Sequence, residues 1–363
     1  MKHGHQTAQN LQIEYEQLTT QELHKRYRYF IAKDVHKRST TYNVRDRMGT
    51  ILDHGETATD YQDLHDRLEP YLDSALIVME ASTSYYKLYQ AFLENGYDVV
   101  VANTIKIRSL FPKDDNIDAR RLSDMLRLGS VPISFIPGPE TQHLRKLVRT
   151  RHSLMQEKVR WNNRIQALID LEGLRMPPFN AFTKTWTRAL VTYLERPNAS
   201  YELKHTFTHY TRVERHLEEI SKEMLRYTVE HWREEYEFLQ TIPGMGRITG
   251  CYVIADVLPI ERFAVKKGQK SLRRYVGVVP AFSSSGDSVS QGRIPKGSSR
   301  KLLRWALVEA ANAITRTKTK LAQFYKMKKK QKKCSGKAKI ALAHKLSDII
   351  YHVLTTKKPY VAS

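Results

Sequence analysis

The chain has 363 residues, and its 60 Lys and Arg against 38 Asp and Glu give a formal net charge of +22 and a pI near 9.8. This charge is spread along the whole chain, which favours a nucleic acid as partner over an acidic membrane surface, where one strongly basic amphipathic helix is typical. Two distant cysteines, Cys251 and Cys334, exclude a disulfide framework and a zinc knuckle, and the lack of a signal peptide or long apolar run predicts a soluble, cytoplasmic protein without a membrane partner.

The first part of the chain predicts an extension followed by a mixed α/β domain over residues 27–139. Residues 1–26 are polar, which is typical of a flexible or weakly helical extension. Short segments rich in aromatic and β-branched residues then predict three strands at residues 27–35, 40–47 and 50–55. Periodicity next predicts, in order, a helix, a strand, a helix and a strand at residues 58–72, 75–80, 84–96 and 97–103. A basic connection, residues 104–113, leads to a last helix, and this order is that of an RNase H-like (RuvC-like) domain with both faces of its sheet covered.

Four carboxylates fall on three of these elements. Asp34 ends the first strand, Glu80 ends the fourth, and Asp115 and Asp118 lie three apart on one face of the last helix. Because this topology brings the elements together, the four acids are candidate ligands of Mg²⁺ or Mn²⁺, and two such ions about 4 Å apart can clamp both oxygens of a phosphodiester exchange. The alternative is that the acidic residues at the start of the last helix only cap that helix. Asp114 stays an alternative to Asp115, because it lies four residues before Asp118.

The middle region, residues 140–235, predicts long helices. In "TQHLRKLVRTRHSLMQEKVRWNNRIQALIDLEG" apolar side chains recur every seven residues, which predicts a helix with a coiled-coil-like seam formed by Leu147, Leu154, Trp161 and Leu168. This seam can pair with another subunit. An intramolecular hairpin with "YTRVERHLEEISKEMLRYTVEHW" explains the same pattern equally well. Arg149 and Lys158 are among the basic residues of the first helix that we expect to bind nucleic acid. Residues 177–205 predict an elaborated connection without an assigned purpose.

Residues 236–363 predict a mainly α-helical domain that carries a serine-rich loop. The loop "FSSSGDSVSQGRIPKG" consists largely of small residues, so a DNA backbone can approach it closely, and Arg293, Lys296 and Arg300 follow as candidate phosphate ligands. Ser298 or Ser299 is expected to cap the next helix. The glycines of "TIPGMGRITG" either hold a phosphate or merely turn the chain. Residues 316–339 contain eleven Lys or Arg, no Asp or Glu, and two adjacent aromatic residues. This composition predicts nucleic-acid binding by Lys328, Lys329 and Lys330.

The motifs "IAKDVHK", "VMEAS" and "KDDNIDARRL" resemble the three acidic motifs of the DEDD insertion-sequence transposases of the IS110 family, which includes the Piv- and MooV-like proteins. The segments "TIPGMGRITG", "YVGVVPAFSSSGDSVSQGRIPKGSSRKLLRWALVEAA" and "HKLSDIIYHVL" resemble the second conserved domain of the same family. Together these motifs span residues 31–354 in the order of the family. The resemblance therefore covers nearly the whole chain.

The resemblance implies a site-specific DNA recombinase with a hybrid active site. The four family acids carry over onto Asp34, Glu80, Asp115 and Asp118, and the nucleophilic serine carries over onto Ser285, with Ser283, Ser284 and Ser288 as rivals. It further implies metal-dependent cleavage and rejoining of donor and target DNA through a phosphoserine, guided by a noncoding (bridge) RNA, in a homo-oligomer (dimer or tetramer) associated with the nucleoid. The alternative is a RuvC-like endonuclease that hydrolyses branched DNA.

Two residues depart from the family pattern. Lys33 stands before Asp34 where the family usually has an apolar strand residue, and Asp114 stands where it usually has threonine. Because neighbouring side chains of a strand alternate sides, we expect the Lys33 ammonium to point away from Asp34 and into solvent.

Overall fold

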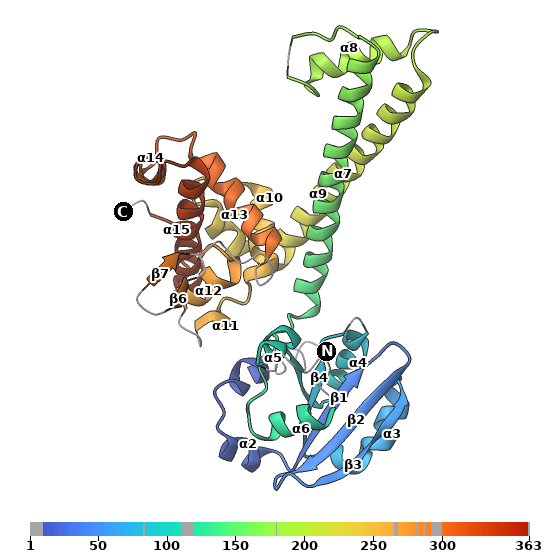
Figure 1. The fold of residues 1–363 in the computed structure, drawn as a ribbon, viewed down its shortest axis with the longest axis vertical. Helices are drawn as coiled ribbons and strands as arrows, with labels where there is room; N and C mark the ends of the chain where they lie inside the picture. The colour runs from blue at the N-terminus through green and yellow to red at the C-terminus, as the bar shows by residue number, and fades with distance from the viewer. Residues whose placement is uncertain are drawn as a thin grey trace. The chain divides into compact units, whose positions relative to one another are not determined.

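The computed structural model describes residues 10–82, 84–110, 119–178, 180–264, 268–279, 282–285, 288–291 and 300–361. The chain forms two compact units, Met1–Gly138 and Pro139–Ser363, and each is described by itself. Figure 1 labels their helices and strands. Among the described helices, none is long and apolar enough to cross a membrane.

The first unit is built on a mixed five-stranded sheet in the order β3-β2-β1-β4-β5 (Figure 1). Strands β1, β2 and β3 form an antiparallel meander, whereas β4 and β5 run parallel to β1. The strands are β1 Tyr29–Val35, β2 Ser39–Asp46, β3 Ile51–Ala58, β4 Ala75–Glu80 and β5 Asp98–Ala102. The helices are α2 Thr20–Arg26, α3 Tyr61–Leu72, α4 Tyr85–Glu94, α5 Thr104–Leu110 and α6 Ala119–Arg127. This arrangement is consistent with the predicted RNase H-like domain.

Hydrophobic cores cover both faces of this sheet, as predicted. Ile31 of β1 packs in a core with side chains of α3 and α4. Its neighbours Phe30 and Ala32 pack in the opposite core, with side chains of α6 and of the N-terminal residues. Alternate residues of β1 therefore contact different helices, as a strand buried on both sides requires.

Two segments of the first unit differ from the sequence prediction. Leu11, Tyr15 and Leu23 are buried in the core that covers the α6 face, so the described residues before β1 are packed rather than loosely attached. The Gln12 side chain also joins this part to the rest of the unit, because it donates to the Tyr89 hydroxyl at 2.7 Å. The predicted basic connection after β5 contains helix α5. The sequence alone does not show these contacts because their partners lie far away along the chain.

The second unit begins with three helices, α7 Pro139–Leu171, α8 Lys184–Leu194 and α9 Tyr201–Gln240. Helices α7 and α9 lie side by side within the chain (Figure 1), and Lys158 of α7 forms an ion pair of 2.7 Å with Glu214 of α9. At one end of the pair, α8 closes a small core lined by Ile165, Ile169, Trp186, Leu190, Leu203 and Tyr210. The intramolecular hairpin is thus present, whereas a coiled coil between subunits stays a prediction.

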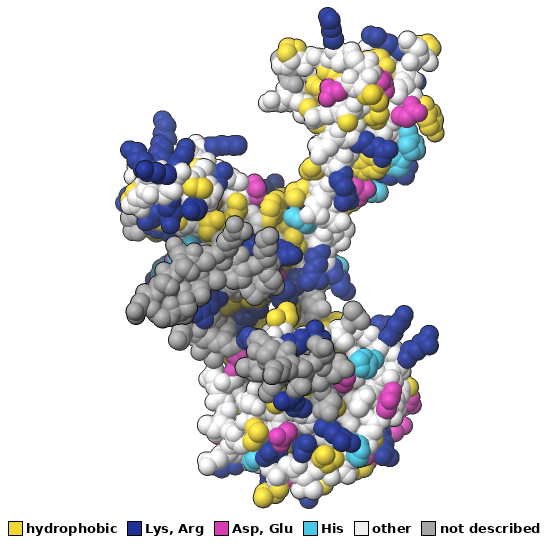
Figure 2. All heavy atoms as spheres, viewed as in Figure 1, with side chains coloured by type: hydrophobic (Ala, Val, Ile, Leu, Met, Phe, Trp, Pro, Cys, Tyr) yellow, Lys and Arg dark blue, Asp and Glu magenta, His cyan; other side chains and the backbone are white. Residues whose placement is uncertain are grey.

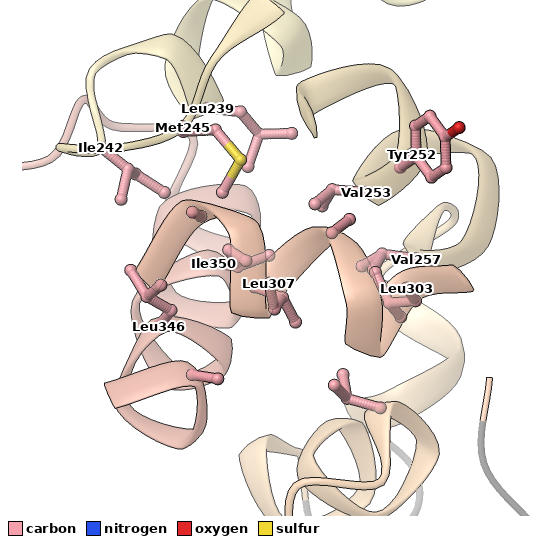
Figure 3. Packing of buried hydrophobic residues seen from close by; sticks show 14 of the residues in the cluster. Leu239, Ile242, Met245, Tyr252, Val253, Val257, Leu303, Leu307, Leu346 and Ile350 are labelled. Carbon is pink, nitrogen blue, oxygen red and sulfur yellow. The ribbon is translucent and has the colours of Figure 1, made fainter. Parts of the chain in front are cut away.

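The rest of the second unit is mostly helical. Its elements are α10 Arg247–Val257, α11 Glu261–Ala264, α12 Gln269–Val276, the hairpin of β6 Phe282–Ser285 and β7 Ser288–Gln291, α13 Lys301–Ile314, α14 Lys320–Lys332 and α15 Ser335–Thr356. One apolar core joins the end of α9, α10, α13 and α15, and Figure 3 shows side chains from each, such as Leu239, Val253, Leu307 and Ile350. This core fixes α13, whose first turn follows the serine-rich loop.

Two turns of the second unit differ from what their sequence suggested. The residue that caps α13 is Arg300, without a capping side-chain hydrogen bond, instead of a serine. Gly244, in the turn before α10, has a φ of 79°, and a Cβ atom there would lie 2.6 Å from the carbonyl oxygen of Ala310 in α13. This turn therefore packs tightly against α13, which favours the interpretation that its glycines turn the chain.

Candidate active site

The structure brings two of the four predicted acids together. Strands β1 and β4 are parallel neighbours in which Lys33 pairs with Met79, so Asp34 and Glu80 follow as adjacent residues at the same edge of the sheet. Burial, the charge of Asp34 and a hydrogen bond with Asp34 all raise the pKa of Glu80. Two carboxylates that share a site in this way repel each other when both are ionised. The pair is therefore suited to a bound cation, which would relieve that repulsion.

A histidine and an arginine also lie near this acidic pair. His36 Nε2 lies 3.2 Å from Asp34 Oδ2 at the end of β1. Arg108 of α5 and His36 act to lower the pKa of Glu80, but they do not outweigh the burial and the neighbouring acid. The Asp34 side chain keeps an exposed fraction of 23%, so a ligand from solvent can reach it.

Asp115 and Asp118, the other two predicted acids, lie outside the described residues, as does Asp114. Ala119, which follows Asp118 in sequence, begins α6 and is buried in the core on the Phe30 and Ala32 side of the sheet. By the alternation of strand residues, Asp34 and Glu80 belong to this same side. Within the described residues alone, no group of three His, Cys, Asp or Glu is placed to hold a metal ion.

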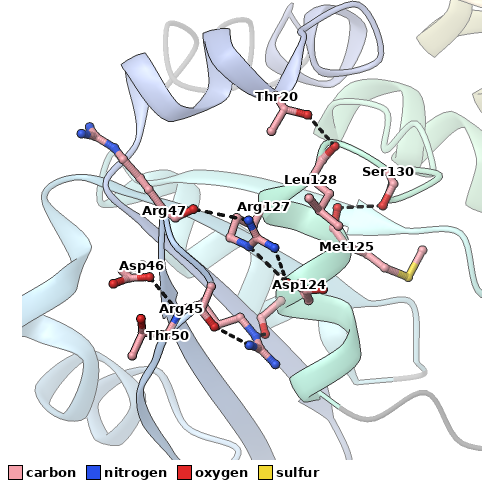
Figure 4. Close-up of polar contacts among 12 residues, drawn as sticks. Thr20, Arg45, Asp46, Arg47, Thr50, Asp124, Met125, Arg127, Leu128 and Ser130 are labelled. Carbon is pink, nitrogen blue, oxygen red and sulfur yellow. Dashed lines mark hydrogen bonds and ion pairs between the residues drawn. The ribbon is translucent and has the colours of Figure 1, made fainter.

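A polar network that the sequence did not reveal holds α6 on the sheet. Ser123 Oγ donates to the buried Asn43 Oδ1 of β2 at 2.7 Å and accepts from Arg45 Nε at 3.1 Å. One turn later, Arg127 pairs with Asp124 at 2.8 Å and donates to the carbonyl oxygen of Arg47, as Figure 4 shows. Because these contacts join α6 to β2 and to Arg47 just after it, the network fixes the position of the helix that follows the third acidic motif.

The expectation for Lys33 is wrong in one respect. Its Nζ lies 3.1 Å from the centroid of the Phe92 ring, in the core on the α4 side and away from the Asp34 side. However, the residue has an exposed fraction of 0%, so the ammonium does not reach solvent. Burial lowers the pKa of Lys33 well below its usual value, and its Nζ has no hydrogen-bond partner among the residues described.

Replacing Lys33 by Met is expected to stabilise the protein by about 1–3 kcal/mol. The change removes a buried amine without a hydrogen-bond partner and keeps an unbranched side chain of similar length, while the loss of the Phe92 ring contact offsets only part of the gain. The urea midpoint of the full-length variant measures this effect. A matched Lys37→Met change, at an exposed residue two positions after β1, should change the free energy of unfolding by less than about 0.5 kcal/mol. A lower midpoint for Lys33→Met would contradict the prediction.

The predicted nucleophile lies in a small hairpin of the second unit. Ser285 is the last residue of β6, and its backbone pairs with Ser288 at the start of β7. Arg293 and Lys296 lie outside the described residues. Arg300 begins the described chain after them, and its N–H donates to the carbonyl oxygen of Tyr275 at 3.2 Å. The segment that carries Ser285 is thus held at its two ends by this hydrogen bond.

The other predicted nucleic-acid-binding residues fall on the helices of the second unit. Arg149, Lys329 and Lys330 are exposed, and Figure 2 shows Lys and Arg side chains gathered over α14. Lys328 donates to Gln331 Oε1 at 3.0 Å, and Lys158 is engaged in its ion pair with Glu214. Of the two aromatic residues beside the basic run, Tyr325 has an exposed fraction of 8%, so its ring packs in the core instead of offering a stacking surface.

Comparison with known proteins relates both units to transposases. Residues 31–172 match the model of the IS110-type DEDD transposases, and residues 236–326 match that of the transposase IS116/IS110/IS902 family. The transposase for insertion sequence element IS1111A of Coxiella burnetii is 24% identical over 298 residues, which are 78% of this chain and 79% of that protein. The transposase for IS1328 of Yersinia enterocolitica is 23% identical over 65% of this chain and 70% of its own length. Because the two models together match more than half of the chain, in the same order as the predicted motifs, the chain belongs to the IS110 family of transposases and is a DNA transposase.

Proposed function

We propose that this transposase cuts and rejoins donor and target DNA through a phosphoserine formed on Ser285, with the help of a divalent metal held by Asp34, Glu80, Asp115 and Asp118. The observation that carries the proposal is the pairing of Asp34 with Glu80 at one edge of the sheet, where burial and the charge of Asp34 raise the pKa of Glu80. The family match of both units supports the combination of an acidic site with a second, serine-bearing domain.

The donor set fits the proposed metal. Carboxylate oxygens are the ligands that Mg²⁺ and Mn²⁺ prefer, and the nearby Arg108 and His36 do not outweigh the burial and the charge of Asp34 that raise the pKa of Glu80. Asp115 and Asp118 would add ligands from positions shortly before α6 in sequence, and α6 itself packs on the same side of the sheet as Asp34 and Glu80. When bound, the metal would stabilise negative charge on the phosphate that reacts.

The serine would act by exchanging one phosphodiester for another. Its oxygen forms a bond to phosphorus while the bond from phosphorus to a DNA oxygen breaks, and the proton lost by the serine balances the one gained by the released DNA hydroxyl. A second DNA hydroxyl then attacks the phosphoserine and restores the serine. The number of phosphodiester bonds is conserved, so the strands can be rejoined without another energy source.

We also infer that a noncoding RNA guides the reaction and that the enzyme works as a homo-oligomer in the bacterial nucleoid. The net charge of +22 supports binding of more than one nucleic-acid strand. The exposed basic residues Arg149, Lys329 and Lys330 lie on the helices α7 and α14, where they can contact nucleic acid. The pair α7 and α9 is the candidate surface for self-association, and α7 is the helix of the pair that is rich in Lys and Arg.

A search for a covalent protein–DNA adduct tests the proposal. Purified protein is incubated with Mg²⁺, end-labelled donor and target duplexes and the transcript of the flanking noncoding DNA, and the products are separated on a denaturing gel. We expect a protease-sensitive adduct with the native chain, and its loss in Ser285→Ala and in Asp115→Ala. The variants Ser283→Ala, Ser284→Ala and Ser288→Ala are matched controls that should keep the adduct, and omission of the RNA tests guidance.

The opposite result identifies the alternative enzyme. Free nicks without an adduct, formed equally well by Ser285→Ala, would mean that water is the nucleophile. The protein would then act as a RuvC-like endonuclease, with its second unit serving only to bind DNA. An adduct that survives Ser285→Ala but disappears in one of the three control variants would instead move the nucleophile to that serine.

A further inference from the structure

Three guanidinium groups of the second unit gather around one tyrosine. Tyr275 belongs to α12, and the Arg262 and Arg300 guanidinium carbons lie 4.7 and 5.3 Å from the centroid of its ring. Arg145 of α7 donates from Nε to the carbonyl oxygen of Ala255 at 2.8 Å. The three arginines come from α7, α11 and the start of α13, so the fold rather than the local sequence assembles this arginine cluster.

Arg145 and Tyr275 of the arginine cluster share one carboxylate among the described residues, Asp256. Arg145 Nε lies 3.5 Å from Asp256 Oδ1, and Asp256 is the one carboxylate of the described residues that acts on both Arg145 and Tyr275. Although burial acts to raise it, the charges of Arg262, Arg145 and Arg300 lower the pKa of the Tyr275 phenol. The charges of Arg300 and Arg262 also act on the buried Arg145 guanidinium, and like charges that meet in a partly dry environment favour the binding of an anion.

Two donors in the cluster have no hydrogen-bond acceptor in the part of the chain that the structure describes. They are Arg145 Nη2 and the Tyr275 hydroxyl, and both atoms are buried. Arg145 itself has an exposed fraction of 8%. A buried donor that is left without an acceptor costs about 1–3 kcal/mol, and more when it is charged. Oxygen atoms of a bound anion would remove this cost.

The cluster lies where the segment that carries Ser285 leaves and rejoins the helical core. The chain leaves α12 just after Tyr275 and returns at Arg300, and these two residues are joined by their backbone hydrogen bond of 3.2 Å. Arg300 is also the N-cap of α13, a helix of 14 residues whose first turn has no side-chain cap. The amides at the start of a helix attract negative charge, which adds to the charge of the three arginines.

We propose that Arg145, Arg262, Arg300 and Tyr275 form a binding site for a phosphodiester group of the DNA strand, at the base of the segment that carries Ser285. The planar guanidinium group suits phosphate because it can donate two parallel hydrogen bonds to its oxygens. A phosphate held at this base would orient the strand relative to the hairpin of Ser285. The proposal concerns binding, so it stands or falls separately from the phosphoserine chemistry.

Inorganic phosphate is the first probe of the site. The thermal unfolding midpoint of the full-length protein is measured with increasing phosphate, and with sodium chloride of equal ionic strength as reference. We expect phosphate to raise the midpoint of the native protein above the chloride reference, and Arg145→Met to weaken this response about tenfold or more in phosphate concentration. Arg274→Met, which removes an exposed arginine next to Tyr275, is the matched control and should respond like the native chain.

DNA binding is the second probe. Binding of RNA of the same sequence is measured beside it, because the phosphodiester group could belong to either nucleic acid. The dissociation constant of a labelled duplex from the element end is measured at several salt concentrations. We expect Arg145→Met to weaken DNA binding and to reduce the slope of log Kd against log salt by about 1, as the loss of one phosphate contact does. Arg262→Met is a second variant, in case Arg145→Met does not fold.

Two results would overturn the proposal. If phosphate stabilises the native protein no more than chloride does, and both variants bind DNA with the native salt slope, the arginine cluster only supports the fold. If the variants lose RNA binding while DNA binding is unchanged, the assignment to the DNA strand is wrong. Neither result depends on strand cleavage, so a failure of the proposed serine chemistry would be seen separately.

Discussion

Asp34→Asn is expected to reduce DNA strand cleavage by at least about 100-fold and, at the same time, to make the metal-free protein more stable. The loss of cleavage follows from the proposed role of Asp34 as a metal ligand, because an amide oxygen is neutral and binds Mg²⁺ more weakly than a carboxylate. The gain in stability follows from the contact with Glu80, whose pKa is raised by burial and by Asp34. Removing one of the two like charges removes their repulsion.

Two measurements on the full-length protein check these opposite effects. Single-turnover cleavage of an end-labelled duplex gives the loss of activity. Urea unfolding without added metal gives the change in stability, and the free energy of unfolding is expected to rise by about 0.5–2 kcal/mol. Asp73→Asn is the matched control, because Asp73 is an exposed acid just after α3 and lies outside the acidic pair. Cleavage at the native rate would exclude Asp34 as a ligand. A lower midpoint would show that Asp34 contributes to the fold despite its acidic neighbour.

Gly244→Ala is expected to destabilise the protein by about 3–5 kcal/mol. Two causes add up at this position. The φ of 79° is a conformation that alanine adopts only at a cost of about 1–2 kcal/mol. A methyl group there would also lie 2.5 Å from Ile314 Cγ1 and 2.6 Å from the carbonyl oxygen of Ala310, so α13 would have to shift. Because Arg300 caps α13, the shift should also weaken the response to phosphate.

Gly173→Ala separates these two causes. Gly173 follows α7 in the same unit and has a φ of 64°, but nothing lies within 4 Å of the place where its Cβ would be. This control should therefore lose only the conformational part, about 1–2 kcal/mol. The urea midpoints of the two variants, compared with the native chain, give the difference. Equal losses of unfolding free energy in the two variants would mean that α13 moves to make room for the added methyl group without loss of stability.

Local sequence patterns predicted the strands of the first unit and the helices between them, but not α5 or the packing of the residues before β1. The alternation of apolar segments predicted the order of strands and helices, and Asp34 and Glu80 could be placed at strand ends because each closes an apolar run. For the long helix α7, periodicity predicted the helix but left its partner open. A seven-residue apolar spacing has the same appearance whether it packs on another subunit or, as α7 does, on α9 of the same chain.

The sequence by itself determined the mixed sheet, the acidic pair and the basic character of this transposase, because these depend on residue types and on spacings within a few residues. Only the tertiary structure decided that Lys33 is buried against Phe92, that Ser123 joins α6 to β2, and that three arginines surround Tyr275. Each of these contacts joins residues on different elements, beyond the few residues that a local sequence pattern covers. Burial and charge density at such places depend on how the elements pack, and no local pattern in the chain records that packing.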